Sequence, residues 1–132
     1  MKQVLNCIAT SGPSNSAASF QSLVGNIGPD ATETRRRQLF NEAGTLHTAR
    51  IRWDAAPGSG KSWTFTLRKG NPSLADTSLV IVIADTAVEG SSTVKVQIAA
   101  GDWVSWRIDP SGTPAGLYPG ISITFEADVL IT

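Results

Sequence analysis

The sequence contains few of the residue types and segments on which many enzymes and membrane proteins depend. Of its 132 residues, one is cysteine and one is histidine, so an intrachain disulfide is excluded. No apolar run approaches the roughly 20 residues of a membrane-spanning helix, and the start MKQVLNCIATSG is too interrupted to predict a signal peptide. Eleven basic residues balance eleven acidic ones, so no broad attraction to nucleic acid or to a membrane surface is expected.

The only cysteine and the only histidine have ordinary structural explanations. Cys7 lies within the apolar run VLNCIA, where a buried thiol acts as a small hydrophobic side chain. His47 stands between Leu46 and Thr48 at an expected strand start, which favours a surface or half-buried polar role over catalysis. One imidazole cannot build a multi-histidine metal site, so we predict no metal and no cofactor.

Carboxylates could in principle form the acid and base pair of a glycoside hydrolase. Asp85 with Asp102, and Glu126 with Asp128, are the two pairs considered. Glu126 and Asp128 share the outward face of one expected strand, where solvated charge is the usual explanation. Asp102 follows a glycine in a turn, where an aspartate commonly bonds backbone N–H groups. We therefore predict no catalytic residue and no enzyme.

The stretch AAPGSGKS, residues 55–62, fits a relaxed phosphate-loop pattern, and LVIVIAD, residues 79–85, could end in a magnesium-binding aspartate. A phosphate loop must open a helix whose N–H groups face the phosphates. Here WTFTLR follows, which alternates and is rich in β-formers, and Pro57 removes one N–H. The sequence therefore predicts a glycine-rich hairpin connection and no nucleotide site.

The sequence is rich in segments in which apolar and polar residues alternate with a period of two. This pattern is typical of half-buried strands. Turn signals separate the runs, so strands recur about every 10 to 15 residues. This spacing predicts an all-β fold, a single-domain antiparallel β-sandwich of jelly-roll type with about 8 strands. The inward-facing sets are Ala49, Ile51 and Trp53; Trp63, Phe65 and Leu67; Val94, Val96 and Ile98; Val104, Trp106 and Ile108; and Ile121, Ile123, Phe125 and Ala127.

The run from Leu79 to Ile83 differs because it is apolar on both faces. Such a run suits a central strand, or a strand that a partner chain covers. Its alternate residues Val80 and Val82 are therefore candidate interface residues.

Residues 1–42 are less regular, and we interpret them as an N-terminal arm and the first strands, ahead of a sandwich body over residues 43–132. Candidate strands cover residues 4–9, 20–24 and 35–40. The segment TETRRRQLFNEAG could instead form a short helix, but strand is preferred because Gly44 follows closely. The arm could grip neighbouring subunits.

The densest charge cluster and two aromatic residues are the remaining surface candidates. Arg35, Arg36 and Arg37 are flanked by acidic residues, which favours a protein contact or a solvated face over nucleic acid. Trp103 falls on an outward face with Arg107, the composition of an interface anchor. The pair could also stack on a sugar ring, but protein contact is preferred. Tyr118, in the loop GTPAGLYPG, is a second exposed aromatic candidate.

Five segments carry recurring signatures: an AGTL-type strand start, a turn after a long strand, an apolar strand, an AGD-type turn, and a Ser-Gly-Thr-Pro loop before the last strand. With these signatures, residues 43–128 resemble a family of small bacteriophage structural proteins, although the turn at residues 68–71 exchanges Gly and Asn. Such proteins are similar to the jelly-roll sandwiches of the tumour necrosis factor and complement head type. The resemblance implies a homotrimer on a virion surface, and it carries no catalytic residues. The segments are AGTLHTARIRW, PGSGKSWTFTLRKGN, LVIVIAD, VQIAAGDWVSWRIDPSGTPA and ISITFEADV.

Two classes of function remain open. In the first, the chain is a virion structural protein made in the host cytoplasm, and a capsid decoration protein that binds the major capsid protein or other virion proteins is preferred. A tail fibre or baseplate component that recognises a host receptor is the alternative, but no long shaft is visible. In the second class, a carbohydrate-binding module would bind a cell-surface glycan through Trp103 and the loop at 109–120.

Overall fold

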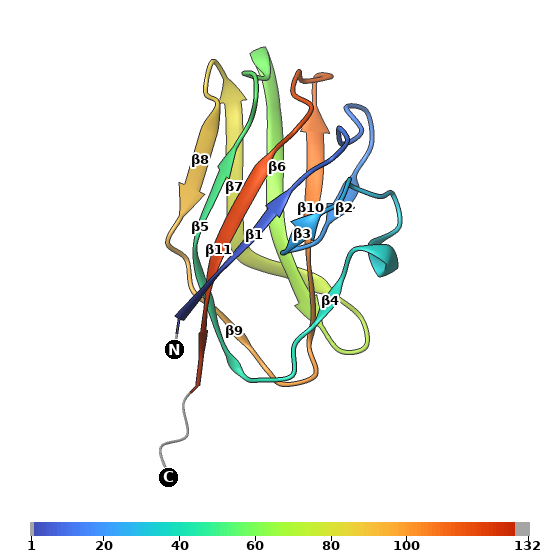
Figure 1. The fold of residues 1–132 in the computed structure, drawn as a ribbon. Helices are drawn as coiled ribbons and strands as arrows, with labels where there is room; N and C mark the ends of the chain where they lie inside the picture. The colour runs from blue at the N-terminus through green and yellow to red at the C-terminus, as the bar shows by residue number, and fades with distance from the viewer. Residues whose placement is uncertain (1, 129–132) are drawn as a thin grey trace.

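The computed structural model describes residues 2–128 and shows a sandwich of two β-sheets (Figure 1). The first sheet has the order β3-β1-β11-β5-β8, and β9 also pairs with β5. The second has the order β2-β10-β6-β7, and β4 also pairs with β10. The first sheet contains β1 (Lys2–Ile8), β3 (Gly25–Asn26), β5 (Gly44–Arg52), β8 (Glu89–Ser92), β9 (Val96–Ile98) and β11 (Gly120–Ala127). The second contains β2 (Ser19–Gln21), β4 (Gln38–Leu39), β6 (Gly58–Gly70), β7 (Ala75–Asp85) and β10 (Trp103–Ser111).

The strand order is that of a jelly roll. β2 and β4 pair with successive parts of β10, so they act as one interrupted strand, and β8 and β9 do the same along β5. Apart from the two-residue β3, the strands counted this way occupy eight positions in two sheets, and their chain order follows two Greek keys. In the described part of the chain, every strand pairing is antiparallel except the short parallel contact between β1 and β3. The predicted fold class is therefore confirmed.

The core lies between the sheets and consists largely of the side chains that the alternation assigned to it. Trp53 and Trp63 stack with ring centroids 4.6 Å apart, and the indole of Trp63 donates to the carbonyl oxygen of Ala115 at 2.9 Å. Cys7 is also buried, as predicted. Val94 departs from its set, because it precedes β9 and is 38% exposed.

The connection at residues 53–57 is not the predicted hairpin. β5 lies in the first sheet and β6 in the second, so the chain crosses from one layer to the other. The residues after the glycine-rich stretch continue β6 as a strand, which confirms the rejection of a phosphate loop. The Gly60 N–H donates to the Asp85 carboxylate at 2.8 Å, so this loop amide and this aspartate serve the fold.

The segment around residues 35–40 is not the single strand that the sequence favoured. A 3₁₀ turn, η1 (Glu33–Arg35), comes first, and β4 (Gln38–Leu39) follows. Both expected elements are thus present in part. Residues 2–42 pair within their own chain, β1 with β11 and β2 with β10. Among the described residues, no helix is long and apolar enough to cross a membrane.

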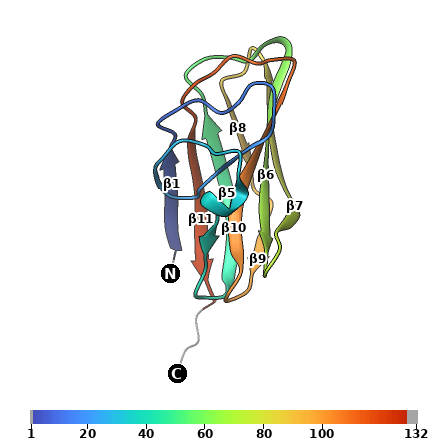
Figure 2. The same ribbon diagram turned by 90° about the vertical axis from the view of Figure 1, so that its right-hand side faces the viewer.

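The run from Leu79 to Ile83 is not a central strand. It lies in β7, which occupies an edge of the second sheet and pairs only with β6 in the described part of the chain. Leu79, Ile81 and Ile83 face the core, whereas Val80 and Val82 face outward. Figure 2 shows β1 and β11 on one side of the molecule and β6 and β7 on the other.

Candidate functional site

The outer face of the second sheet carries the most prominent candidate interface. Val80 is 43% exposed and Val82 is 57% exposed. In register, Val80 stands opposite Thr66 of β6, and Val82 stands opposite Thr64. We call Val80, Val82, Thr64 and the adjacent Ala84 the valine surface. It is apolar or weakly polar throughout, and β7 has no ladder partner other than β6 in residues 2–128, although β8 packs against the β7 edge.

A chain of ion pairs borders the valine surface. The Asp76 carboxylate accepts from Arg68 at 2.6 Å and from Arg107 at 2.7 and 3.0 Å. Arg107 also donates to Asp109 at 2.8 Å. At the other end, Arg68 donates to both Glu33 oxygens, at 2.7 and 3.2 Å. These five residues, Glu33, Arg68, Asp76, Arg107 and Asp109, form the charged network.

The network favours the charged forms of Asp76, Arg68 and Arg107. Hydrogen bonds from Arg68, and then from Arg107, lower the pKa of Asp76 below its ordinary value of 3.8. The Glu33 hydrogen bond raises the pKa of Arg68, and the Asp109 hydrogen bond raises the pKa of Arg107. Glu33 also accepts from the buried Ser105 hydroxyl at 2.6 Å, which ties η1 to the sheet.

All but one of the other predicted surface residues near this face have structural roles. Trp103 is half-buried rather than exposed, because the Arg37 guanidinium lies 3.9 Å from its ring centroid. The Arg36 side chain donates to the Gly28 carbonyl oxygen at 2.6 Å. Arg35 remains exposed, with an ion pair to Asp30 at 3.7 Å. Two residues of the arginine triplet thus stabilise their own chain.

Tyr118 is exposed, as predicted, but it lies apart from Trp103. Tyr118 is 51% exposed and belongs to the loop that leaves the far end of β10. Trp103 begins β10 and pairs with Gly70 at the opposite end of the sheet. The two aromatic residues therefore do not form one sugar-binding site.

The candidate carboxylate pairs also do not assemble into an acid and base pair. Asp85 lies opposite Gly58 at one end of β6, whereas Asp102 precedes the β10 residue that pairs with the other end. Asp102 accepts the Ala99 N–H at 2.9 Å, as its turn predicted. Glu126 lies 3.2 Å from the half-buried His47 ring. Within residues 2–128, no group of three or more His, Cys, Asp or Glu residues could hold a metal ion.

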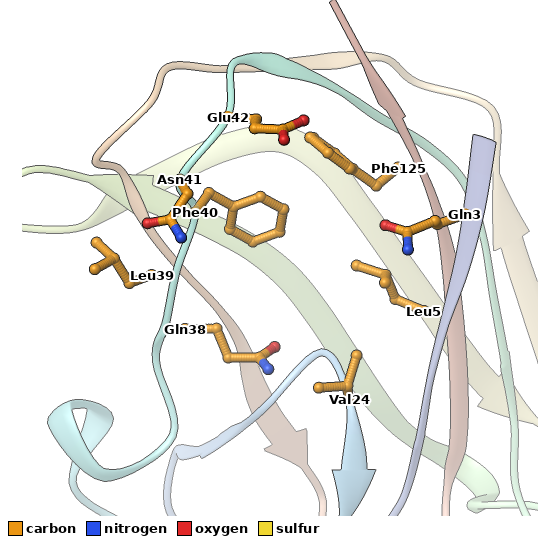
Figure 3. A pocket seen from close by; sticks show the side chains of 9 residues that line it. All are labelled: Gln3, Leu5, Val24, Gln38, Leu39, Phe40, Asn41, Glu42 and Phe125. Carbon is orange, nitrogen blue, oxygen red and sulfur yellow. The ribbon is translucent and has the colours of Figure 1, made fainter. Parts of the chain in front are cut away.

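A groove of about 350 Å³ opens on the side of the sandwich that faces away from β7. Phe40 and Phe125 meet there edge to face, 5.1 Å between ring centroids, and Leu5 points into the same space (Figure 3). Beside it, β3 pairs only with Cys7 and Ile8 of β1. In residues 2–128, the rest of β1 has β11 as its one ladder partner.

Sequence reasoning missed both the charged network and the groove. Alternation placed Arg68 and Arg107 outward, but it carried no signal that Asp76 would bridge them. The groove combines side chains from β1, β11 and the segment before β5, which are distant in the sequence. Local sequence patterns contain no information on which distant side chains come into contact.

Comparisons with known proteins show that this chain is similar to them only at the level of the fold. No family model matches the chain, and no curated protein matches it. The globular domain of zebrafish complement 1qA protein is similar at 12% identity, with 91% of this chain and 94% of that chain covered and a TM-score of 0.46. The Eiger TNF from S. frugiperda is similar at 13% identity, with 97% and 96% covered and a TM-score of 0.45. No activity or partner is drawn from identities this low.

Proposed function

We propose that this chain is a non-enzymatic structural module that assembles with copies of itself through the valine surface and serves as a bacteriophage capsid decoration protein. The observation that carries the assembly is the pair of exposed valines on an edge strand, bordered by the charged network. Protein interfaces commonly combine an apolar centre with a polar rim. Exposed apolar side chains on an edge strand are an aggregation hazard, which favours a cognate partner.

The physical basis of this assembly is burial with little loss of side-chain freedom. Valine is β-branched and loses little side-chain entropy when it is covered. The arginines at the rim are already held by Asp76, Asp109 and Glu33. A surface ordered before contact reduces the entropic cost of association.

The finer role as a decoration protein is supported by the resemblance of residues 43–128 to small phage structural proteins. The same resemblance suggests that three copies assemble. A place on the virion surface, and contact with the major capsid protein, are part of this proposal. A tail fibre or baseplate component, or a glycan-binding module, is the alternative.

The first test is the mass of the purified protein by light scattering. We expect three times the 13.9 kDa of one chain, and we expect Val82→Lys to lower the mass toward that of a monomer, because a charge cannot be buried there without a partner. Val4→Lys is the matched control, since Val4 is 63% exposed on the first sheet. A monomeric wild type, or a trimer that Val82→Lys leaves intact, would contradict the proposed assembly.

The decoration role has its own test, which is co-sedimentation with bacteriophage capsids. Wild-type protein should sediment with the capsids of its own phage, and saturating amounts should delay their thermal disruption. Protein that binds tails or isolated host surfaces and leaves capsids bare would favour the alternative.

A further inference from the structure

The outer face of the first sheet, opposite the valine surface, contains a hollow of about 370 Å³. Two rows of paired residues surround it. One row is Ile8, Gly120 and Arg52, and the next is Asn6, Ser122 and Arg50. Because Gly120 has no side chain, the middle of the first row is empty, and the hollow lies between Ile8 and Asn6 on one side and the two arginines on the other.

The two arginines present positive charge that their surroundings leave available. Both are exposed on β5. The acid nearest in register is Glu89, opposite Arg52, yet neither guanidinium lies within ion-pair distance of any carboxylate in residues 2–128. In this respect Arg50 and Arg52 differ from Arg68 and Arg107, which form ion pairs within the charged network.

We propose that this hollow binds a sugar residue that carries a carboxylate, a hexuronic acid or a sialic acid. A guanidinium presents a planar fork that matches a carboxylate. The Asn6 amide and the Ser122 hydroxyl supply donors and acceptors for ring hydroxyls. Ile8, which is 58% exposed, offers an apolar surface to the C–H face of a ring.

The size of the hollow selects among anions. Small-molecule sites begin at about 300 Å³, so this hollow accommodates one ring and exceeds what sulfate fills. A bare anion would contact the arginines and leave Ile8 and Asn6 unused. An acidic sugar uses both sides of the hollow. This inference goes beyond the proposed assembly and uses the opposite face, so either can fail alone.

The experiment is a calorimetric titration of the full chain with methyl glucuronide and with N-acetylneuraminic acid, which separates the two sources of carboxylate. Methyl glucoside is the neutral control, and sodium sulfate tests for a plain anion site. We expect at least one acidic sugar to bind, more weakly as salt rises. Arg50→Gln and Arg52→Gln should each weaken it about tenfold or more, the loss of a charge-assisted hydrogen bond.

Two further variants separate shape from charge. Gly120→Leu keeps both arginines and should abolish binding by filling the hollow. Within 4 Å, a Cβ at this position meets only the Arg52 carbonyl oxygen, at 3.9 Å, so the backbone has room for a side chain. Arg35→Gln removes the same charge from an arginine with a 71% exposed side chain elsewhere and should leave binding unchanged. No binding of either acidic sugar, equal binding of methyl glucoside or sulfate, or full binding by Gly120→Leu would each overturn the proposal.

Discussion

Asp76 joins the two arginines of the charged network, so its protonation state affects both β6 and β10. Its carboxylate is 49% exposed, and water therefore screens much of the interaction. The lowered pKa of Asp76 means that the folded state holds the charged carboxylate more tightly than the unfolded chain does. The stabilisation is present above the ordinary pKa and is lost as pH falls through the folded-state pKa.

We expect Asp76→Asn to lower the free energy of unfolding by about 1 kcal/mol at neutral pH, a value discounted for exposure. At a pH well below 3.8, where the folded-state carboxylate becomes protonated, the wild type should lose this advantage, so the two unfolding curves should converge. Urea denaturation followed by tryptophan fluorescence at both pH values measures the difference. A gap of constant size across this pH range would show that the carboxylate charge is not the cause.

At the scale of elements, β8 closes the sandwich against the β7 edge through a glycine. A Cβ on Gly90 would lie 2.8 Å from a methyl of Ile81 and 3.1 Å from a carbon of Ile83. Gly90 is thus required for close approach, and its backbone does not have a positive φ. The two sheets come together on this side because one position lacks a side chain.

Replacing Gly90 by alanine should therefore destabilise the fold by about 1 to 3 kcal/mol, the usual cost of overpacking a core. Ser91→Ala is the matched control, because Ser91 is exposed on the same strand and surface changes usually stay within about 0.5 kcal/mol. Chemical denaturation of both variants gives the comparison. Equal stabilities would mean that β8 moves away at little cost.

At the scale of the whole molecule, residues 2–42 are part of both sheets. β1 covers one side of β11 along its length, and β2 and β4 cover β10. A detachable arm would leave the body of the sandwich intact. The observed pairing instead makes the body depend on the N-terminal strands for its ladders and for part of its core.

A fragment of residues 43–132 should consequently fail to fold on its own. Without β1, the backbone of β11 loses the ladder that pairs Lys2 to Ile8 with Gly120 to Glu126, and buried polar groups without partners are costly. Circular dichroism and thermal unfolding of the fragment beside the full chain make the comparison. A cooperative transition in the fragment would support the arm interpretation instead.

The local sequence pattern is enough to predict which faces of the strands are buried. Alternation is a local property, since neighbouring side chains in a strand point to opposite sides, and the inward sets at Trp63 and Ile121 follow from it directly. Local patterns also identified turns, such as the one in which Asp102 binds the Ala99 N–H. The resulting sandwich could be predicted because two half-apolar sheets must cover each other.

The choice of strands that share a sheet, and the contacts of each outward residue, depend on tertiary packing. This packing placed β7 at an edge, sent the chain across layers at residues 53–57, and covered Trp103 with Arg37. It also brought Asp76 between two arginines and left Gly120 beside Arg52. These contacts join residues that are far apart in the chain. Strand register depends on the whole set of contacts, and no local sequence pattern contains that information.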